Sequence, residues 1–343
     1  TRVRSSAASD VYKRQMYDTF LLGSDAMFFD IILLLIGFIV IIKSSDILVD
    51  AASSLALKLK VPKMLIALTI VAFGTCAPEV AISFQSVSAG NGAIAFGNVV
   101  GSCIVNILLI IGLASFIHPI RVKHATIKKE LPLLSIVTSV FSILMLDRVF
   151  NPLTRSSFSR ADALILMLLF LMFVLYLVQM LFRRDSNDTE DVRIKYPPVV
   201  SALLLLGSII LIALSSDLIV DSAQNIARAM HISEKIITMF VIVVGTSLPE
   251  MIMTITSASK GEFDMAIGNI IGTNIFNICI VLGLPILIYG DIPLTGFGLI
   301  DIGMVFLSST LLFIFARSER VINKKESIVM LVIFALYYIY LLF

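Results

Sequence analysis

Long apolar runs, each close to 20 residues, follow one another along most of the chain and are separated by short polar segments. A helical run of about that length crosses the ~30 Å hydrocarbon core of a bilayer. Because the apolar residues are continuous and do not alternate with polar ones, the pattern excludes a transmembrane β-barrel and predicts an all-α integral membrane protein. Ten transmembrane helices are expected, with starts near Met27, Val61, Ala93, Leu131, Ala161, Val199, Ser233, Met265, Thr295 and Ser327.

The chain repeats itself at an offset of 171 residues, and the match of Ser44–Gly112 with Ser215–Gly283 contains no gap. Three motif pairs carry this match: SSDILVDAA with SSDLIVDSA, GTCAPE with GTSLPE, and GNVVGSCIVNI with GNIIGTNIFNI. Each half holds five predicted spans, and because five is odd, the second half enters the membrane from the opposite side. The sequence therefore predicts two inverted-topology five-helix repeats, which are typical of secondary transporters. A duplicated channel is the alternative.

Polar segments divide the chain into four predicted parts. Residues 1–26 form a polar N-terminal tail, not necessarily native, which lacks the apolar stretch of a signal peptide. Residues 27–182 form the first repeat, 183–198 a short cytoplasmic linker and 199–343 the second repeat. Lys and Arg number 16 in one alternate set of loops and 5 in the other. The positive-inside rule then predicts that both termini lie outside.

Composition excludes several classes of protein. The chain of 343 residues is 58% hydrophobic and 15% charged, with a mean hydropathy of +1.01, which a water-soluble enzyme of this size could not cover with polar surface. With 26 basic and 24 acidic residues, it has no basic stripe for nucleic acid. The three cysteines lie within apolar segments, so a disulfide framework or zinc site is not expected.

Two glutamates, Glu79 and Glu250, lie deep within the second and seventh spans at matching positions of the repeat. An ionised carboxylate at that depth costs at least ~2.5–3.5 kcal/mol. Neither span has Lys, Arg or His in its core, so a buried ion pair is not available. The acids are predicted to be protonated or to bind a metal cation; two neutral acids with a packing role are the alternative.

A proline stands directly before each glutamate, at Pro78 and Pro249. Proline lacks an N–H and clashes with the preceding turn, so both spans are expected to break there and to free main-chain carbonyls. Such backbone survives at this depth only where it faces protein, water or an ion. The expected carbonyl donors are those of Ala72, Thr75, Val243 and Thr246, and GTSLPE adds the hydroxyl of Ser247.

The third and eighth spans each carry three neutral polar side chains at i, i+4 and i+8, which share one helix face. These are Asn98, Ser102 and Asn106 in the first repeat and Asn269, Thr273 and Asn277 in the second. Beside each stripe lies a GxxxG pair, which lets another helix approach closely. We expect the glycines to bring these oxygens near the carboxylates.

The predicted ligands are all hard oxygen donors, which suit Ca²⁺ better than Mg²⁺, and Na⁺ can use the same cage. Two glutamates balance one divalent ion, whereas more than one monovalent ion would be needed to replace it. Competition for one site is what exchange requires. Cys76 offers a softer ligand, but one sulfur among many oxygens argues for packing. No cofactor is expected beyond the transported ions.

At GTCAPE with GNVVGSCIVN and at GTSLPE with GNIIGTNIFN, the sequence resembles the cation/Ca²⁺ antiporter superfamily, in particular its prokaryotic sodium/calcium exchanger branch. The resemblance implies ten helices in two inverted halves that exchange Ca²⁺ for Na⁺ across the cytoplasmic membrane by alternating access. By motif position it implies the following roles: Ca²⁺ and Na⁺ ligation by Glu79 and Glu250, further oxygens from Thr75 and Thr246, sodium positions at Ser102 and Thr273, and the centre completed by Asn106 and Asn277.

The resemblance further implies that the first and sixth spans slide past a fixed core. They carry Asp46, Asp50, Asp217 and Asp221, for which helix-end charges in a solvated entrance are an equal alternative to ion binding. The sequence departs from the family at Cys76 and Cys103, which replace a hydroxyl and an amide, and at Asn277, where several members have Asp. The missing carboxylate puts potassium co-transport in doubt.

Other functions remain as alternatives to Na⁺-driven Ca²⁺ exchange. Buried acids with raised pKa would suit a proton-coupled Ca²⁺ or Mn²⁺ exchanger. An intramembrane protease is disfavoured because GFGLID misses the aspartyl motif and all three histidines lie at span ends or in loops. A passive channel would differ by lacking counter-ion dependence.

Overall fold

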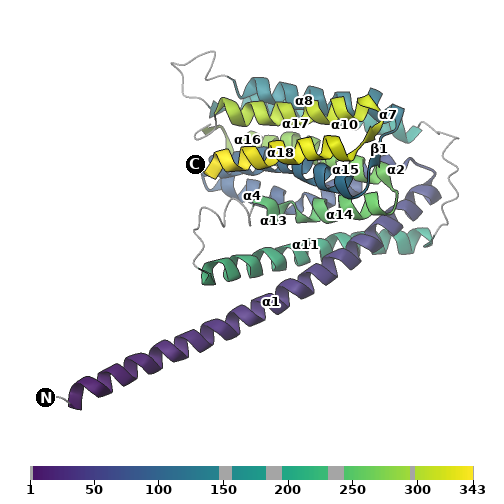
Figure 1. The fold of residues 1–343 in the computed structure, drawn as a ribbon. Helices are drawn as coiled ribbons and strands as arrows, with labels where there is room; N and C mark the ends of the chain where they lie inside the picture. Colours follow the sequence, from purple (N-terminus) through teal and green to yellow (C-terminus); the bar gives the residue numbers. More distant parts are fainter. Residues whose placement is uncertain (1–2, 147–156, 183–194, 231–242, 294–297, 343) are drawn as a thin grey trace.

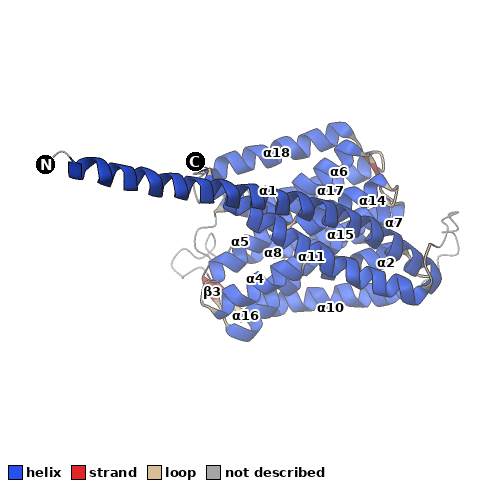
Figure 2. Ribbon diagram, turned by 90° about the horizontal axis from the view of Figure 1, so that it is seen from below, coloured by secondary structure: helices blue, strands red, loops and turns tan. Residues whose placement is uncertain are grey.

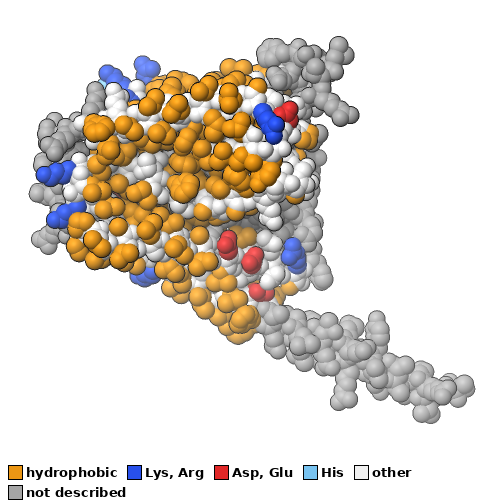
Figure 3. Space-filling model, turned by 180° about the vertical axis from the view of Figure 1, so that it is seen from behind, with side chains coloured by type: hydrophobic (Ala, Val, Ile, Leu, Met, Phe, Trp, Pro, Cys, Tyr) orange, Lys and Arg blue, Asp and Glu red, His pale blue; other side chains and the backbone are white. Residues whose placement is uncertain are grey.

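Helices make up nearly all of the structure, and their apolar side chains face outward as well as inward. The computed structural model describes residues 3–146, 157–182, 195–230, 243–293 and 298–342. Within these residues, six helical segments are long and apolar enough to cross a bilayer, and a seventh candidate is a bent pair. Figure 3 shows hydrophobic side chains over most of one face, with Lys and Arg near its margins. The protein is therefore an all-helical membrane protein, as predicted.

The first half of the chain begins with a helix of 57 residues, α1, whose N-terminal part projects beyond the other helices (Figure 1). Two later spans of this half are assembled from short helices and π-helical turns. The elements are α1 (Val3–Leu59), α2 (Lys63–Ile66), η1 (Ala67–Val71), α3 (Ala72–Thr75), α4 (Ala77–Ser88), α5 (Gly92–Ile104), η2 (Val105–Ile111), α6 (Gly112–Ile117), β1 (Ile120–Arg121), α7 (His124–Lys128), α8 (Glu130–Leu144), β2 (Ser157–Phe158) and α10 (Arg160–Phe182).

The second half follows the same order, starting with α11, which packs along α1 (Figures 1 and 2). Gly37 of α1 lies so close to α11 that a Cβ there would be 2.7 Å from Ile219. The elements are α11 (Pro198–Ala229), α13 (Val243–Thr246), α14 (Leu248–Ser259), α15 (Phe263–Phe276), η4 (Asn277–Leu282), α16 (Gly283–Tyr289), β3 (Ile292–Pro293), α17 (Leu299–Ser318), β4 (Val321–Ile322) and α18 (Lys324–Leu342).

Two spans lie at the centre of the bundle. In the most apolar 18-residue stretch of Gly92–Ile117, 72% of the residues are buried, and in the corresponding stretch of Phe263–Tyr289 the share is 83%. The corresponding shares are 17% for Met27–Leu59 and 11% for Arg160–Phe182. Since polar side chains on the two central spans avoid lipid, these spans are where a polar site costs least.

Two short antiparallel sheets join the halves. Strand β1 pairs with β4, with Ile120 opposite Ile322, and β2 pairs with β3, with Phe158 opposite Ile292. Ile120, Phe158 and Ile322 are fully buried. Each sheet thus ties a loop of one half to a loop of the other.

Most predicted spans coincide with helices that start within a few residues of the expected positions. The predicted start at Ser233 lies outside the described residues. Helix α8 begins as expected but is only 15 residues long in the described part. Helix α1 (Val3–Leu59) includes most of the polar segment before Met27.

Candidate functional site

The second span breaks where the proline motif predicts. Residues Lys63–Thr75 form one arm and Ala77–Ser88 the other, and the two arms are bent by 50°. Cys76 between them has φ −75° and ψ 2°, outside the helical region. Pro78 occupies the first turn of α4, where its missing N–H costs nothing. The break therefore places Glu79 in the first turn of the second arm.

The second repeat has the same local structure. Helix α13 ends at Thr246, Ser247 has φ −90° and ψ 9°, and α14 begins at Leu248. Glu250 lies in the first turn of α14, directly after Pro249. The positive end of each helix dipole thus faces a glutamate and favours its charged form.

Both glutamates are fully buried, at 0% exposure. Among the residues that the structure describes, none of their four carboxyl oxygens has a hydrogen-bond partner of normal geometry, although the Thr75 hydroxyl lies close to Glu250. The two carboxyl groups are near enough to each other to interact electrostatically. Two adjacent buried acids without donors have a large unmet demand for positive charge, which protons or a metal cation would satisfy.

The first predicted stripe begins on α5, which packs against α4. Ser102 and Asn106 are fully buried, and the hydroxyl of Ser102 has no partner. Asn98 is half-buried, and its amide lies 3.5 Å from the main-chain oxygen of Glu79. Of the three members of the stripe, Asn98 thus contacts the main chain next to the first break.

The second stripe is entirely buried. The Asn269 amide donates to the Thr254 hydroxyl at 3.3 Å, and the Thr75 hydroxyl lies 3.5 Å from the side-chain oxygen of Asn269. Thr273 and Asn277 have side-chain oxygens without a hydrogen-bond partner. This stripe contacts the break of the opposite repeat through Thr75, which brings the two halves together at one place.

Close glycine packing holds α15 against the first broken span. A Cβ on Gly272 would lie 2.7 Å from the Ala72 Cβ and 2.9 Å from the Leu68 carbonyl oxygen. A Cβ on Gly268 would lie 2.7 Å from the Met64 Sδ. The second GxxxG pair therefore has the role that the sequence suggests.

The main-chain carbonyl oxygens that are expected to bind a cation differ in their surroundings. The Ala72 carbonyl accepts hydrogen bonds from the Cys76 N–H at 3.1 Å, the Cys76 thiol at 2.8 Å and the Thr75 hydroxyl at 3.3 Å, so it is not freed by the break. The helix instead opens one turn later, at Cys76. Val243 and Thr246 lie in α13, and the Ser247 hydroxyl is fully buried without a partner.

Sequence reasoning missed three buried polar residues near the carboxylates. Ser83 and Thr254 lie one helical turn after the glutamates, at matching positions of the repeat, and the Ser83 hydroxyl has no partner. Asn274 accepts a hydrogen bond of 3.1 Å from the Asn106 amide. The i+4 spacing from the glutamates could have identified the first two.

Each stripe also ends in a π-helical turn. These turns are η2, which includes Asn106, and η4, which begins at Asn277. π-Helical turns are rare and occur mostly at functional sites. They widen the helix where the two asparagines lie, at matching positions of the two halves.

The cysteines behave as packing residues in the described structure. Cys76, Cys103 and Cys279 are buried and free. Among the described residues there is no cluster of three or more His, Cys, Asp or Glu side chains that could hold a metal. Any cation at the two glutamates would therefore depend on neutral oxygens for its remaining ligands.

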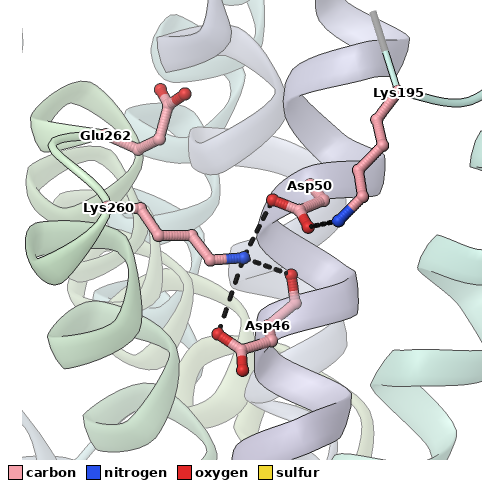
Figure 4. A pocket seen from close by; sticks show the side chains of 5 residues that line it. All are labelled: Asp46, Asp50, Lys195, Lys260 and Glu262. Carbon is pink, nitrogen blue, oxygen red and sulfur yellow. Dashed lines mark hydrogen bonds and ion pairs between the residues drawn. The ribbon is translucent and has the colours of Figure 1, made fainter.

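The aspartates of the first span pair with lysines and not with the residues of this centre. Asp46 and Asp50 of α1 contact Lys260, and Asp50 also pairs with Lys195, around a cavity of about 530 Å³ (Figure 4). This arrangement matches helix-end charges in an entrance, the alternative given above.

Comparisons with known proteins agree on one family. A family model described as "Sodium/calcium exchanger protein" matches residues 29–179 and 200–343. The chain is 37% identical over 326 residues to CaxA of Alkalimonas amylolytica, which is named as an antiporter; the match covers 91% of this chain and 98% of CaxA. It is 36% identical over 266 residues to the inner membrane protein YrbG of Escherichia coli, covering 75% and 79% of the two chains.

The fold has a close relative among solved structures. A structure of the sodium-calcium exchanger NCX_Mj superposes with a TM-score of 0.77 at 27% identity, covering 90% of this chain and 98% of that one. The sodium/calcium exchanger MaX1 of Methanosarcina acetivorans is 27% identical over 344 residues, covering 91% and 98% of the chains.

Proposed function

Because the chain belongs to the sodium/calcium exchanger protein family, we propose that it is a secondary antiporter that moves Ca²⁺ in exchange for Na⁺. The observation that carries this proposal is the pair of fully buried carboxyl groups, Glu79 and Glu250, whose oxygens have no hydrogen-bond partner of normal geometry within the described part of the chain. One divalent cation would neutralise both charges. The neighbouring neutral oxygens would then complete its coordination.

The proposed ligand set comes from both halves. It comprises Glu79, Glu250, Thr75, Thr246, Ser247, Asn98, Ser102, Asn106, Asn269, Thr273, Asn277 and the carbonyls of Ala72 and Val243. Ca²⁺ takes 6–8 oxygens at about 2.3–2.6 Å, so only part of this set would bind one ion at a time. The remaining oxygens leave room for several Na⁺ ions. Because Ca²⁺ and Na⁺ would share ligands of this set, binding of one ion would exclude binding of the other.

Ion exchange at such a site requires access from each side in turn. We propose ten membrane helices arranged as two inverted repeats, residues 27–182 and 199–343, joined by the linker 183–198. The matching breaks at Cys76 and Ser247 support this arrangement, since each repeat supplies one glutamate from the first turn of a half-helix. Ions would bind near the midplane, where the halves meet, and reach either side by alternating access.

Location and orientation follow from the same proposal. The protein would lie in the cytoplasmic membrane with both termini outside. The two chain ends lie at the same end of the bundle in Figure 1, which agrees with an even number of crossings. Proton coupling finds no support among the relatives described above, and we do not propose it.

Radiolabelled Ca²⁺ uptake into everted membrane vesicles tests the function. Vesicles loaded with Na⁺ and diluted into choline medium should take up Ca²⁺, whereas vesicles loaded with K⁺ or choline should not. Collapse of the pH gradient with a protonophore should leave the sodium-driven uptake intact. Uptake that follows the pH gradient and ignores Na⁺ would contradict the proposal.

A further inference from the structure

The side chain of Lys260 lines the cavity shown in Figure 4 and points toward Asp46 and Asp50. Its Nζ lies 2.7 Å from the Asp46 carbonyl oxygen, 2.8 Å from the Asp50 Oδ1 and 3.5 Å from the Asp46 Oδ1. Lys260 directly follows α14, the helix whose first turn carries Glu250. Lys260 therefore lies ten residues, roughly 15 Å, along the helix axis from Glu250 of the proposed ion site.

The charges around this cavity are unequal. Its lining contains three carboxylates, on Asp46, Asp50 and Glu262, and two ammonium groups, on Lys195 and Lys260. Glu262 is also paired with Lys63 at 2.8 Å. The hydrogen bond from Lys195 to Asp50 raises the pKa of Lys195, so this exposed lysine stays charged. Removal of Lys260 would change the lining charge from −1 to −2.

The repeat shows that this lysine is specific to one end of the molecule. Asp217 and Asp221 of α11 correspond to Asp46 and Asp50, and they are exposed rather than half-buried. The residues that correspond to Lys260 and Glu262 are Ala89 and Asn91, which carry no charge. The two ends of the duplicated structure therefore present the same pair of aspartates, but only one pair is neutralised by a lysine from the α14–α15 turn.

We propose that Lys260 makes ion binding differ between the two faces of the membrane, because its positive charge weakens the attraction of cations to the entrance on one face. The loop charges place this entrance at the cytoplasmic face. This inference rests on the proposed function and concerns how strongly ions are drawn in from that face. A unit positive charge repels Ca²⁺ twice as strongly as Na⁺. The lysine would therefore weaken the attraction of Ca²⁺ at this face more than that of Na⁺.

Ca²⁺ and Na⁺ dependence of exchange in oriented vesicles tests this inference. In everted vesicles at about 10 mM ionic strength, Lys260→Met should lower the half-saturating Ca²⁺ concentration about threefold and that of Na⁺ less than twofold, for charges about 10 Å apart in water. At about 150 mM choline chloride the effect on Ca²⁺ should fall below twofold. Right-side-out vesicles should show no change, and the maximal rate should be preserved.

Two variants serve as controls. Lys260→Arg keeps the charge and should behave as wild type, and Lys128→Ala removes a lysine from the α7 segment outside the cavity and should leave both half-saturating concentrations unchanged. While wild-type exchange stands, four results for Lys260→Met would overturn the inference. The half-saturating Ca²⁺ concentration could change equally on both faces, change on the outer face alone, change independently of salt, or not change at all. Absence of sodium-driven Ca²⁺ flux in wild-type vesicles would overturn the proposed function and this inference together.

Discussion

Asn106 donates a hydrogen bond of 3.1 Å from its side-chain amide to the side-chain oxygen of Asn274, which joins the two central spans. The repeat predicts a second such bond, from Asn277 to residue 103, but position 103 is a cysteine. Both polar atoms of the Asn277 side chain accordingly lack a hydrogen-bond partner in the described part of the structure. The departure at Cys103 thus removes one of two matching hydrogen bonds beside the proposed ion site.

We expect Asn274→Ala to destabilise the protein by about 1–3 kcal/mol, because the buried Asn106 amide would lose its acceptor. Cys103→Asn should have the opposite effect, since it offers an acceptor to Asn277. Thermal unfolding of the purified protein in detergent, without added Ca²⁺, measures both changes. A lower melting temperature for both variants would show that packing at these positions outweighs hydrogen bonding.

Glu79→Gln and Glu250→Gln should each reduce sodium-driven Ca²⁺ uptake to background. Each variant removes one of the two charges that a divalent ion would balance. In the absence of ions, the same variants should be at least as stable as wild type, because a buried carboxylate without donors is costly.

Stabilisation by Ca²⁺ distinguishes the loss of ion binding from a change in the stability of the ion-free protein. Wild type should gain about 2.7 kcal/mol in the presence of Ca²⁺ at one hundred times its Kd, and the variants should gain nothing. Glu319→Gln, at an exposed position in the loop after α17, is the matched control and should keep both uptake and the Ca²⁺-dependent gain. Normal uptake by both buried-site variants would refute the proposed ligands.

Gly272→Ala should destabilise the protein by about 1–3 kcal/mol and reduce exchange. Its Cβ would lie 2.9 Å from the Leu68 carbonyl oxygen, and main chain cannot move aside as a flexible side chain does. Gly303→Ala is the control, because no atom lies within 4 Å of its Cβ position. It should be neutral or stabilising by up to about 1 kcal/mol. Circular dichroism melts of the two variants check the contrast, which equal stabilities would contradict.

Ser83→Ala should raise the half-saturating concentration of a transported ion without loss of stability. The Ser83 hydroxyl is fully buried one turn after Glu79 and has no hydrogen-bond partner among the described residues. Its removal therefore costs no internal hydrogen bond but would remove a ligand. Thr254→Val is a useful comparison, because it also removes the acceptor of the Asn269 amide and should lower the melting temperature. Unchanged ion dependence in Ser83→Ala would assign this hydroxyl a packing role only.

The sequence predicts the spans and both breaks because these depend on local properties. Lipid selects long apolar runs, and proline interrupts the helix at its own position, so neighbouring residues decide the outcome. The duplication adds an internal alignment that identifies Glu79 and Glu250 as equivalent. Predictions about which residues lie at the breaks therefore agree with the structure.

The features that the sequence does not reveal depend on contacts between distant segments. The Lys260 ammonium meets Asp50 across 210 positions, and the Asn106 amide meets Asn274 across 168. No local pattern encodes such pairings. The Ala72 carbonyl shows the limit of local rules as well, because the thiol and N–H of Cys76 satisfy it in spite of the nearby proline.

The two small sheets constrain how the protein is made. Ile120 pairs with Ile322, which leaves the ribosome about 200 residues later. At synthesis rates of about 5–20 residues per second, β4 is synthesised on the order of 10–40 s after β1. During that interval the emerging N-terminal half has an unpaired strand edge at β1, so completion of this sheet is a late event that depends on the synthesis of β4.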